Sequence, residues 1–258
     1  MNFTAVQLMG LVDQWLWPFL RVAALIMAAP VLGTRAVPPR IRMILALALC
    51  VVVVPVLPPP PVLDPFTAAG LSVGVQQVLI GITIGLAVRL IFTVFDVTGQ
   101  LLGQQMGLAF ASLIDPQNGT QVPVVSQVYV LFTTLLFLAL DGHLLLIEAV
   151  VDSFALLPVG AAGITQAGAG RLLAFGGEVL AQAVLIAAPV IATLLIANLA
   201  FGVMARSTPQ LNIFAVGFPL TILVGVAAIW LTLPLIEGQF TGLLDRSLTV
   251  AREILNER

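Results

Sequence analysis

Six runs of almost uninterrupted apolar residues dominate this chain of 258 residues. They cover residues 15–32, 41–57, 68–95, 128–147, 172–204 and 213–236. A transmembrane helix needs about 20 such residues, and lipid offers no hydrogen-bond partner to an irregular backbone. We therefore predict an all-α integral membrane protein with about six hydrophobic helices, arranged as kinked hairpins. The run 41–57 is short and the long runs contain breakers, so hydropathy alone does not establish that each run crosses the bilayer.

The composition supports this class and argues against others. Hydrophobic residues make up 60% of the chain and charged residues 9%, whereas a soluble domain carries about 25% charged residues. A net charge of −2 argues against a nucleic-acid-binding protein, which would carry a basic face. The sequence also lacks the motifs of metalloproteases, serine hydrolases, phosphate-binding loops and dinucleotide-binding folds. We expect no enzyme activity, cofactor or bound metal.

Residues 99–127 are too polar and too rich in glycine to span lipid, yet residues 108–114 form an apolar segment within them. Irregular backbone at membrane depth is tolerated only where it is buried in protein or lines a cavity. The composition therefore indicates a loop that lies in, or closes, a passage. An ordinary water-exposed connector is an equally simple interpretation.

Several glycines fall four residues apart and would lie along one face of a helix. They are Gly70 and Gly74, Gly81 and Gly85, and Gly99, Gly103 and Gly107. In membranes, small residues at this spacing let helix backbones approach closely. We predict that this part of the chain packs tightly against other helices, either its own or those of a partner.

Two other local features bear on shape and orientation. Gly217 lies beside Pro219 inside an apolar run, which makes this the best hinge candidate, although kinks are also common in helices that do not move. The connector 33–42 holds Arg35, Arg40 and Arg42, the densest basic cluster on the chain. By the positive-inside rule it should face the cytoplasm.

Three charged residues in the apolar runs are candidates for burial: Arg89, Asp96 and Glu178. Arg89 and Asp96 are seven residues apart, about 10 Å along a helix, so each could instead contact another helix. A transporter would place such groups at the bilayer midplane, whereas an assembly subunit would use them to fix helix register. The sequence alone leaves both interpretations open.

The tail, residues 237–258, carries apolar residues at helical spacing with charged residues mostly between them. This pattern predicts an amphipathic helix. Its charges are of both signs, which favours docking on a partner over lying on an anionic membrane surface.

Several segments resemble the FliR family of flagellar type III export-gate membrane proteins. Residues 208–220, TPQLNIFAVGFPL, resemble the family signature, and residues 105–116, QMGLAFASLIDP, are similar to its central loop. Residues 141–144 and 151–154 fit the family's mid-chain pattern. The resemblance extends over essentially the whole chain, which implies a single export-gate domain over residues 1–258.

The resemblance implies a structural, pore-forming subunit of the bacterial inner membrane and flagellar basal body. Such subunits assemble with FliP-like and FliQ-like membrane proteins and with a FlhB-like export-switch protein, and unfolded substrates pass through the assembly. The central loop would plug the closed pore, with Phe110 at the position of an aromatic plug residue. The plug residues implied are Met106, Gly107, Leu108, Phe110, Leu113 and Ile114.

Two alternatives remain open at this stage. The chain could be the homologous subunit of a virulence-type III secretion system, although the sequence of residues 212–220, NIFAVGFPL, favours the flagellar branch. A stand-alone secondary transporter using Arg89, Asp96 and Glu178 is the alternative from another class. The lack of a visible inverted repeat counts against a transporter.

Overall fold

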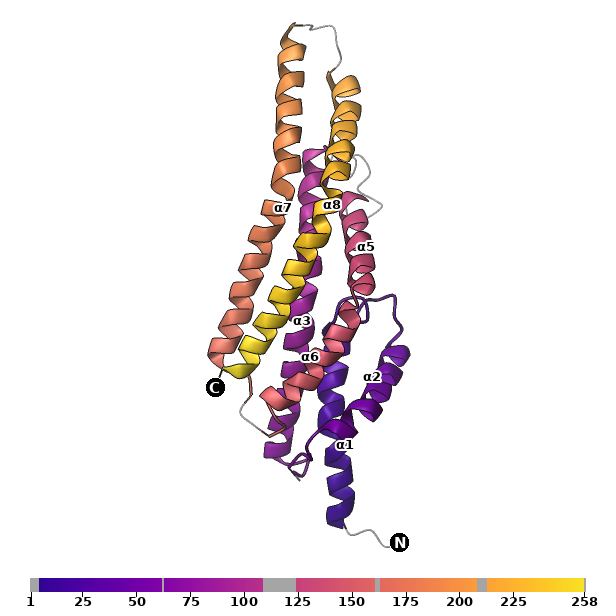
Figure 1. Cartoon of the computed structure of the whole chain (residues 1–258), viewed down its shortest axis with the longest axis vertical. Coiled ribbons are helices and arrows are strands. Elements are labelled where there is room, and N and C mark those ends of the chain that lie inside the picture. Colours follow the sequence, from indigo (N-terminus) through magenta and orange to yellow (C-terminus); the bar gives the residue numbers. More distant parts are fainter. Residues whose placement is uncertain (1–4, 62, 109–123, 161–162, 208–212, 258) are drawn as a thin grey trace. The chain divides into compact units, whose positions relative to one another are not determined.

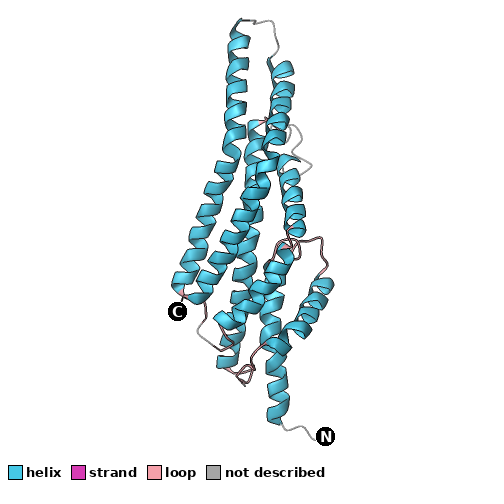
Figure 2. Cartoon of the chain, viewed as in Figure 1, coloured by secondary structure: helices cyan, strands magenta, loops and turns pink. Residues whose placement is uncertain are grey.

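The computed structural model describes residues 5–61, 63–108, 124–160, 163–207 and 213–257. Every regular element within these ranges is helical (Figure 2). In chain order the elements are α1 (Ala5–Ala28), α2 (Pro39–Val53), the 3-10 helix η1 (Val54–Val56), α3 (Ala68–Gln105), α5 (Val124–Ala139), α6 (Gly142–Leu156), α7 (Gln166–Ser207) and α8 (Ile213–Asn256) (Figure 1). The predicted all-α class is confirmed.

The number of candidate membrane helices is smaller than the six apolar runs suggested. Among the described residues, four helices are long and apolar enough to cross a membrane, or five if α5 and α6 together form one broken span. These two helices are bent by 65° at residues 140–141, so the run 128–147 is not one helix. Asp141 there takes a left-handed conformation (φ 54°). A Cβ on Gly142 would overlap the Phe137 ring, so only glycine fits at this bend.

The amphipathic tail is the continuation of α8, which runs unbroken to Asn256. Along it Leu244, Ala251 and Ile254 are buried, whereas Asp245 and Arg252 are exposed. The predicted two-faced helix is therefore present, but it is not a separate element. No residue between 236 and 256 adopts a non-helical conformation that would end α8.

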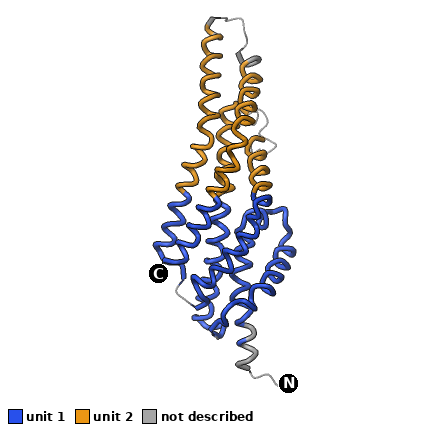
Figure 3. The backbone as a smooth tube through the Cα atoms, in the orientation of Figure 1, with its two compact units in different colours: residues 1–90, 137–176, 244–258 blue, residues 91–136, 177–243 orange. Residues whose placement is uncertain are grey.

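The chain divides into two compact units, coloured in Figure 3. Unit 1 comprises residues 1–90, 137–176 and 244–258, and unit 2 comprises residues 91–136 and 177–243. The long helices α3, α7 and α8 each contribute one part to unit 1 and another to unit 2.

In unit 1, α1 and α3 run in the same direction at very short separation. Gly74 lies beside Leu20, Gly81 beside Leu25 and Gly85 beside Ala28. A Cβ on Gly85 would lie 2.7 Å from the Ala28 Cβ, and one on Gly81 would overlap the Arg21 carbonyl oxygen. Side chains larger than hydrogen would force these two helices apart.

Ion pairs fasten the end of α8 within unit 1. Arg171 of α7 contacts Glu253 at 3.0 Å and Glu257 at 2.5 Å, and Arg252 contacts Asp152 of α6 at 3.1 Å. These side chains are substantially exposed, so each pair contributes about 1 kcal/mol or less. The pairs set the orientation of the helix end more than its stability.

In unit 2, the second part of α3 is the central element. The Phe95 ring packs on Phe240 of α8 with centroids 6.0 Å apart. The Thr98 hydroxyl donates to the Ala183 carbonyl of α7 at 3.1 Å. α3 is thereby held by α7 and α8 over the turns that lead to its C-terminal end.

Candidate functional site

The candidate site is the place in unit 2 where α3 ends and the central loop begins. The Gly107 N–H donates to the Gln104 carbonyl and the Leu108 N–H to the Gly103 carbonyl, both at 3.0 Å. This pair of bonds, with Gly107 at φ 78°, is the Schellman motif that stops a helix. Because a left-handed residue is strained unless it is glycine, Gly107 fixes the point at which the chain leaves α3.

Met106 anchors this helix end. Its side chain is buried and lies against Gly225 of α8, where an added Cβ would come within 2.7 Å of the Met106 Cγ. The absence of a side chain at Gly225 therefore creates the space that Met106 fills. The predicted loop region 99–127 is helical up to Gln105 in this structure.

The other end of the loop is held by the start of α5. Gly99 of α3 lies so close to Ser126 that a Cβ on the glycine would overlap the Ser126 backbone. The Ser126 hydroxyl donates to the Asp96 carboxylate, one turn earlier on α3. One flank of the loop is thus packed on α8 through Met106 and the other on α3 through Ser126, and residues 124–127 belong to α5. Phe110, Leu113 and Ile114 lie outside the described residues.

The remaining predicted packing glycines differ in their surroundings. Gly81 and Gly85 lie against α1, as described above, whereas a Cβ on Gly74 would make only ordinary contacts at 3.5 Å. Gly70 faces the backbone of residues 64 and 65, immediately before α3. Gly103 is buried, and its carbonyl accepts the second Schellman hydrogen bond.

The predicted hinge lies within α8, which continues through Gly217 and Pro219. Pro219 cannot donate a backbone hydrogen bond. The Thr221 hydroxyl donates to the Gly217 carbonyl at 2.9 Å and to the Asn198 side chain of α7 at 3.2 Å. This threonine therefore connects the candidate hinge to the neighbouring helix.

The three charged residues predicted to be buried do not form one site. Arg89 belongs to unit 1, whereas Asp96 and Glu178 belong to unit 2. Asp96 is half-buried and accepts the Ser126 hydroxyl, but Arg89 and Glu178 are exposed on this single chain. The expectation of burial therefore does not hold for Arg89 and Glu178 within the chain itself. Their positions on α3 and α7 leave both side chains on outward faces.

Comparison with known proteins identifies the chain's relatives. A sequence model of the family described as "Bacterial export proteins, family 1" matches residues 12–247. The chain is 38% identical to the flagellar biosynthetic protein FliR of Pectobacterium carotovorum subsp. carotovorum, over 100% of this chain and 98% of that relative. The chain belongs to the FliR family. It is 35% identical to FliR of Escherichia coli (strain K12), with the same coverage, and 34% identical to FliR of Aquifex aeolicus over 84% of each chain.

Membership of the FliR family makes this chain a component of the flagellar export apparatus, with helices apolar enough for membrane insertion. The family match covers nearly all the described helices, including α3 and the start of α5. The resemblance inferred from residues 105–116 and 208–220 is therefore confirmed at the level of the family.

The sequence analysis did not single out Arg21, whose side chain makes four hydrogen bonds in this FliR-family chain. This side chain is fully buried in unit 1, and its Nε and Nη2 atoms donate to Gln77 Oε1 at 2.9 and 2.5 Å. It also donates to Ser153 Oγ at 3.0 Å and to the Leu157 carbonyl at 2.9 Å. The guanidinium lies 4.0 Å from the centre of the Phe154 ring. Arg21 thereby joins α1, α3 and the C-terminal end of α6.

A signal for this cluster was present in the sequence. Asp13, Trp17 and Arg21 are spaced four residues apart and so share one face of α1. All three are buried, and Asp13 Oδ2 accepts the Leu63 N–H at 3.0 Å. Within the described structure, Asp13 Oδ1 and Trp17 Nε1 have no hydrogen-bond partner. Two charged residues on one face of a mostly apolar helix indicate a face that packs inside the protein.

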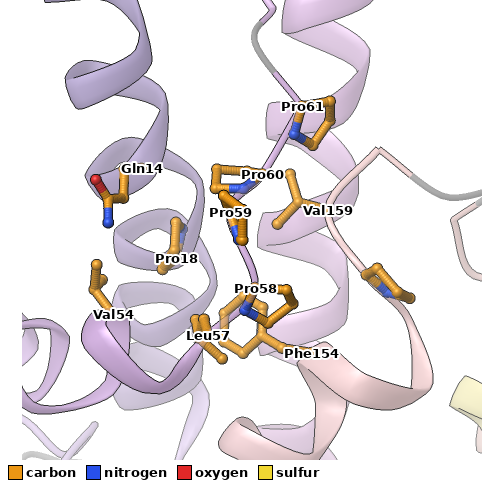
Figure 4. Close-up of a pocket in the computed structure, with 11 residues that line it drawn as sticks. Gln14, Pro18, Val54, Leu57, Pro58, Pro59, Pro60, Pro61, Phe154 and Val159 are labelled. Carbon is orange, nitrogen blue, oxygen red and sulfur yellow. The ribbon is translucent and has the colours of Figure 1, made fainter.

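A cavity of about 290 Å³ lies beside this cluster (Figure 4). Pro58, Pro59, Pro60 and Pro61 line it, and so does Phe154, whose ring also contacts the Arg21 guanidinium. Its lining residues are Gln14, Pro18, Val54, Leu57, Pro58, Pro59, Pro60, Pro61, Phe154, Pro158 and Val159. Gln14 supplies the only polar side chain among them, so this lining offers no group for acid–base or nucleophilic chemistry.

Proposed function

We propose that this chain is a structural, pore-forming subunit of the flagellar type III export gate in the bacterial inner membrane. It assembles with FliP-like and FliQ-like subunits and contacts a FlhB-like export-switch protein in the basal body. Unfolded flagellar proteins pass through the assembly. The central loop, with Phe110, Leu113 and Ile114, blocks the closed channel.

The anchoring of the central loop supports the plug. Met106 is buried on one flank and Ser126 on the other, and both contact helices of unit 2. A loop held at both ends by packed helices can be displaced and can return without the helices separating. A free connector would not need a buried side chain at each end.

The outer surface of α7 supports assembly with other subunits, and this observation carries the proposal. The helix has 42 residues, about 63 Å at about 1.5 Å per residue, twice the roughly 30 Å hydrocarbon core of a bilayer. Large apolar side chains are exposed along nearly all of it: Leu173, Leu180, Val184, Leu185, Leu195, Ile196, Leu199, Val203 and Met204. These side chains extend from Leu173 to Met204, about 47 Å at about 1.5 Å per residue, which is longer than the hydrocarbon core, so neighbouring protein covers the remainder.

The other predicted residues have roles within this proposal. Gly81 and Gly85 hold α1 against α3 within unit 1. Gly217 and Pro219 provide the bend in α8 during opening. Arg89 and Glu178, which are exposed on the single chain, face lipid headgroups or neighbouring subunits in the assembly.

The plug is tested by deleting residues 109–116, which leaves the Schellman motif and the buried Met106 in place. We expect a complex of normal composition that leaks ions in the resting state, measured as ion flux across the membrane of cells carrying the assembled gate. Phe110→Ala should leak to a smaller extent. Phe66→Ala, at a phenylalanine that is 98% exposed on the connector before α3, is the matched control and should remain tight.

A complex that assembles normally and stays tight after the deletion would contradict the plug role. Assembly itself is tested by purification in mild detergent through a C-terminal tag, followed by native mass spectrometry. We expect one copy of this chain with several copies of small hydrophobic partners. A monomer or a homodimer would contradict the proposed gate and would favour a stand-alone transporter.

A further inference from the structure

A groove runs along the surface of unit 1 between α1 and α3. It has a volume of about 460 Å³, within the range of small-molecule sites. Its α1 side is built from Ala23, Ala24 and Ala28, whose short side chains leave the space open. Met27 is 64% exposed and Ile82 is 39% exposed, and these longer side chains form its rims.

The groove is apolar except at one end. Eight of the nine side chains that line it are hydrocarbon or thioether, and the ninth is Arg89. Arg89 follows Leu86 by three residues, one helical turn further along α3. Because α1 and α3 run in the same direction and Ala28 lies beside Gly85, this turn lies where α1 ends. The single charge is therefore at the C-terminal end of α1.

The basic connector begins at the same end of α1. Gly33 donates a backbone hydrogen bond to Ala29, which turns the chain at the helix terminus. Arg42 donates to the carbonyls of Val37 and Thr34 and so closes the turn. Arg35 and Arg40 are exposed. The positive-inside rule places such a cluster on the cytoplasmic side, where the leaflet is rich in anionic lipid.

We propose that this groove binds an anionic phospholipid, with one acyl chain lying over Ala23 and Ala28 and the phosphate held by Arg89. A guanidinium binds phosphate through two parallel hydrogen bonds, and the neighbouring arginines add a favourable field. The apolar lining of the groove suits an acyl chain, and its one positive end suits one phosphate. A helix of a partner protein is the alternative occupant, and it is about 10 Å wide. To match the same charge pattern, it would have to bury a carboxylate opposite Arg89.

The test uses the full-length protein in mixed micelles, with lipid retention measured by native mass spectrometry. The probes are phosphatidylglycerol and phosphatidylcholine with identical acyl chains. We expect wild-type protein to retain phosphatidylglycerol about tenfold more strongly, the scale of one charge-assisted contact. Arg89→Gln should abolish this preference. Arg206→Gln, the same charge change at an exposed residue of unit 2, should leave it intact.

A second variant examines the groove itself. Ala23→Leu fills the space between α1 and α3 and should reduce retention of both lipids by a similar factor. Equal retention of the two lipids by wild-type protein, or an unchanged preference in Arg89→Gln, would overturn the proposal. A third result would also overturn it: the purified complex contains no bound phospholipid, and a photo-crosslinker placed at Ala23 captures another protein subunit. The groove would then be a protein interface.

Discussion

The buried cluster around Arg21 predicts that replacing Gln77 destabilises the protein more than replacing Arg21 itself. Gln77→Leu removes the acceptor of two of the four hydrogen bonds that Arg21 makes, and leaves a fully buried cation with Ser153 and the Leu157 carbonyl. Removing one partner of a buried charge costs about 3–5 kcal/mol, because the charge remains desolvated.

Arg21→Met should cost less. It leaves the Gln77 and Leu157 oxygens without a donor, at about 1–3 kcal/mol each, but it also removes the several kcal/mol needed to desolvate the cation. These contributions oppose each other, so we expect a net loss below about 2 kcal/mol. Adding Gln77→Leu to Arg21→Met should then recover part of this loss, because it removes the unsatisfied Gln77 oxygen and no charge remains to be satisfied.

Cys50 provides the assay, because it is the single cysteine of the chain and is buried in unit 1. Its reaction with a fluorogenic maleimide on heating in detergent reports unfolding of this unit. At about 2–4 °C per kcal/mol for a chain of this size, Gln77→Leu should lower the midpoint by roughly 10 °C. The double variant should unfold at a higher temperature than Gln77→Leu alone.

Two results would refute this reasoning. One is a larger loss of stability for Arg21→Met than for Gln77→Leu. This would mean that packing of Arg21 against Phe154, and not the buried charge, controls the stability of the cluster. The other is additivity of the two substitutions, which would mean that they do not act through a shared contact.

Other predictions rest on single glycines. Gly81→Ala should lower the Cys50-labelling midpoint, because its Cβ would overlap the α1 backbone; Gly176→Ala, in open space, should leave it unchanged or raise it slightly. Gly107→Val should disturb the end of α3 by about 1–2 kcal/mol, because it forces a branched residue into a left-handed conformation, and should increase resting ion leak. Gly225→Ala should displace Met106 and reduce motility, whereas adding Met106→Ala should restore it; no recovery in the double variant would contradict the assigned contact.

The apolar runs predicted the helices well because membrane insertion leaves the backbone almost no other structure. They did not predict where helices break. The run 128–147 contains no proline, yet it bends by 65° beyond α5. At the bend Asp141 takes a left-handed conformation, and the Phe137 ring lies against Gly142. A contact of this kind depends on rotamer and backbone direction, and hydropathy contains neither.

In the candidate site, too, the sequence predicted some features and only the structure revealed others. Glycine spacing indicated close helix contacts, and Gly81, Gly85 and Gly99 do lie against other helices, but the atoms nearest to Gly70 belong to residues 64 and 65, which precede α3. Of the charged residues selected from the sequence, Arg89 and Glu178 are exposed on the chain and Asp96 is half-buried, whereas Asp13 and Arg21, which were not selected, are buried. Burial of a charge depends on the acceptors that other helices bring to it.

By itself, the sequence determined that this protein is helical and belongs in a membrane, and its motifs placed it in the FliR family. These properties follow from the transfer of apolar side chains out of water and from short segments of chain, so they need no knowledge of neighbours. The tertiary structure decided that Arg21 joins three helices, that Met106 and Ser126 anchor the central loop, and that α1 and α3 leave a groove ending at Arg89. Each of these depends on residues far apart in the chain that meet only when the helices pack.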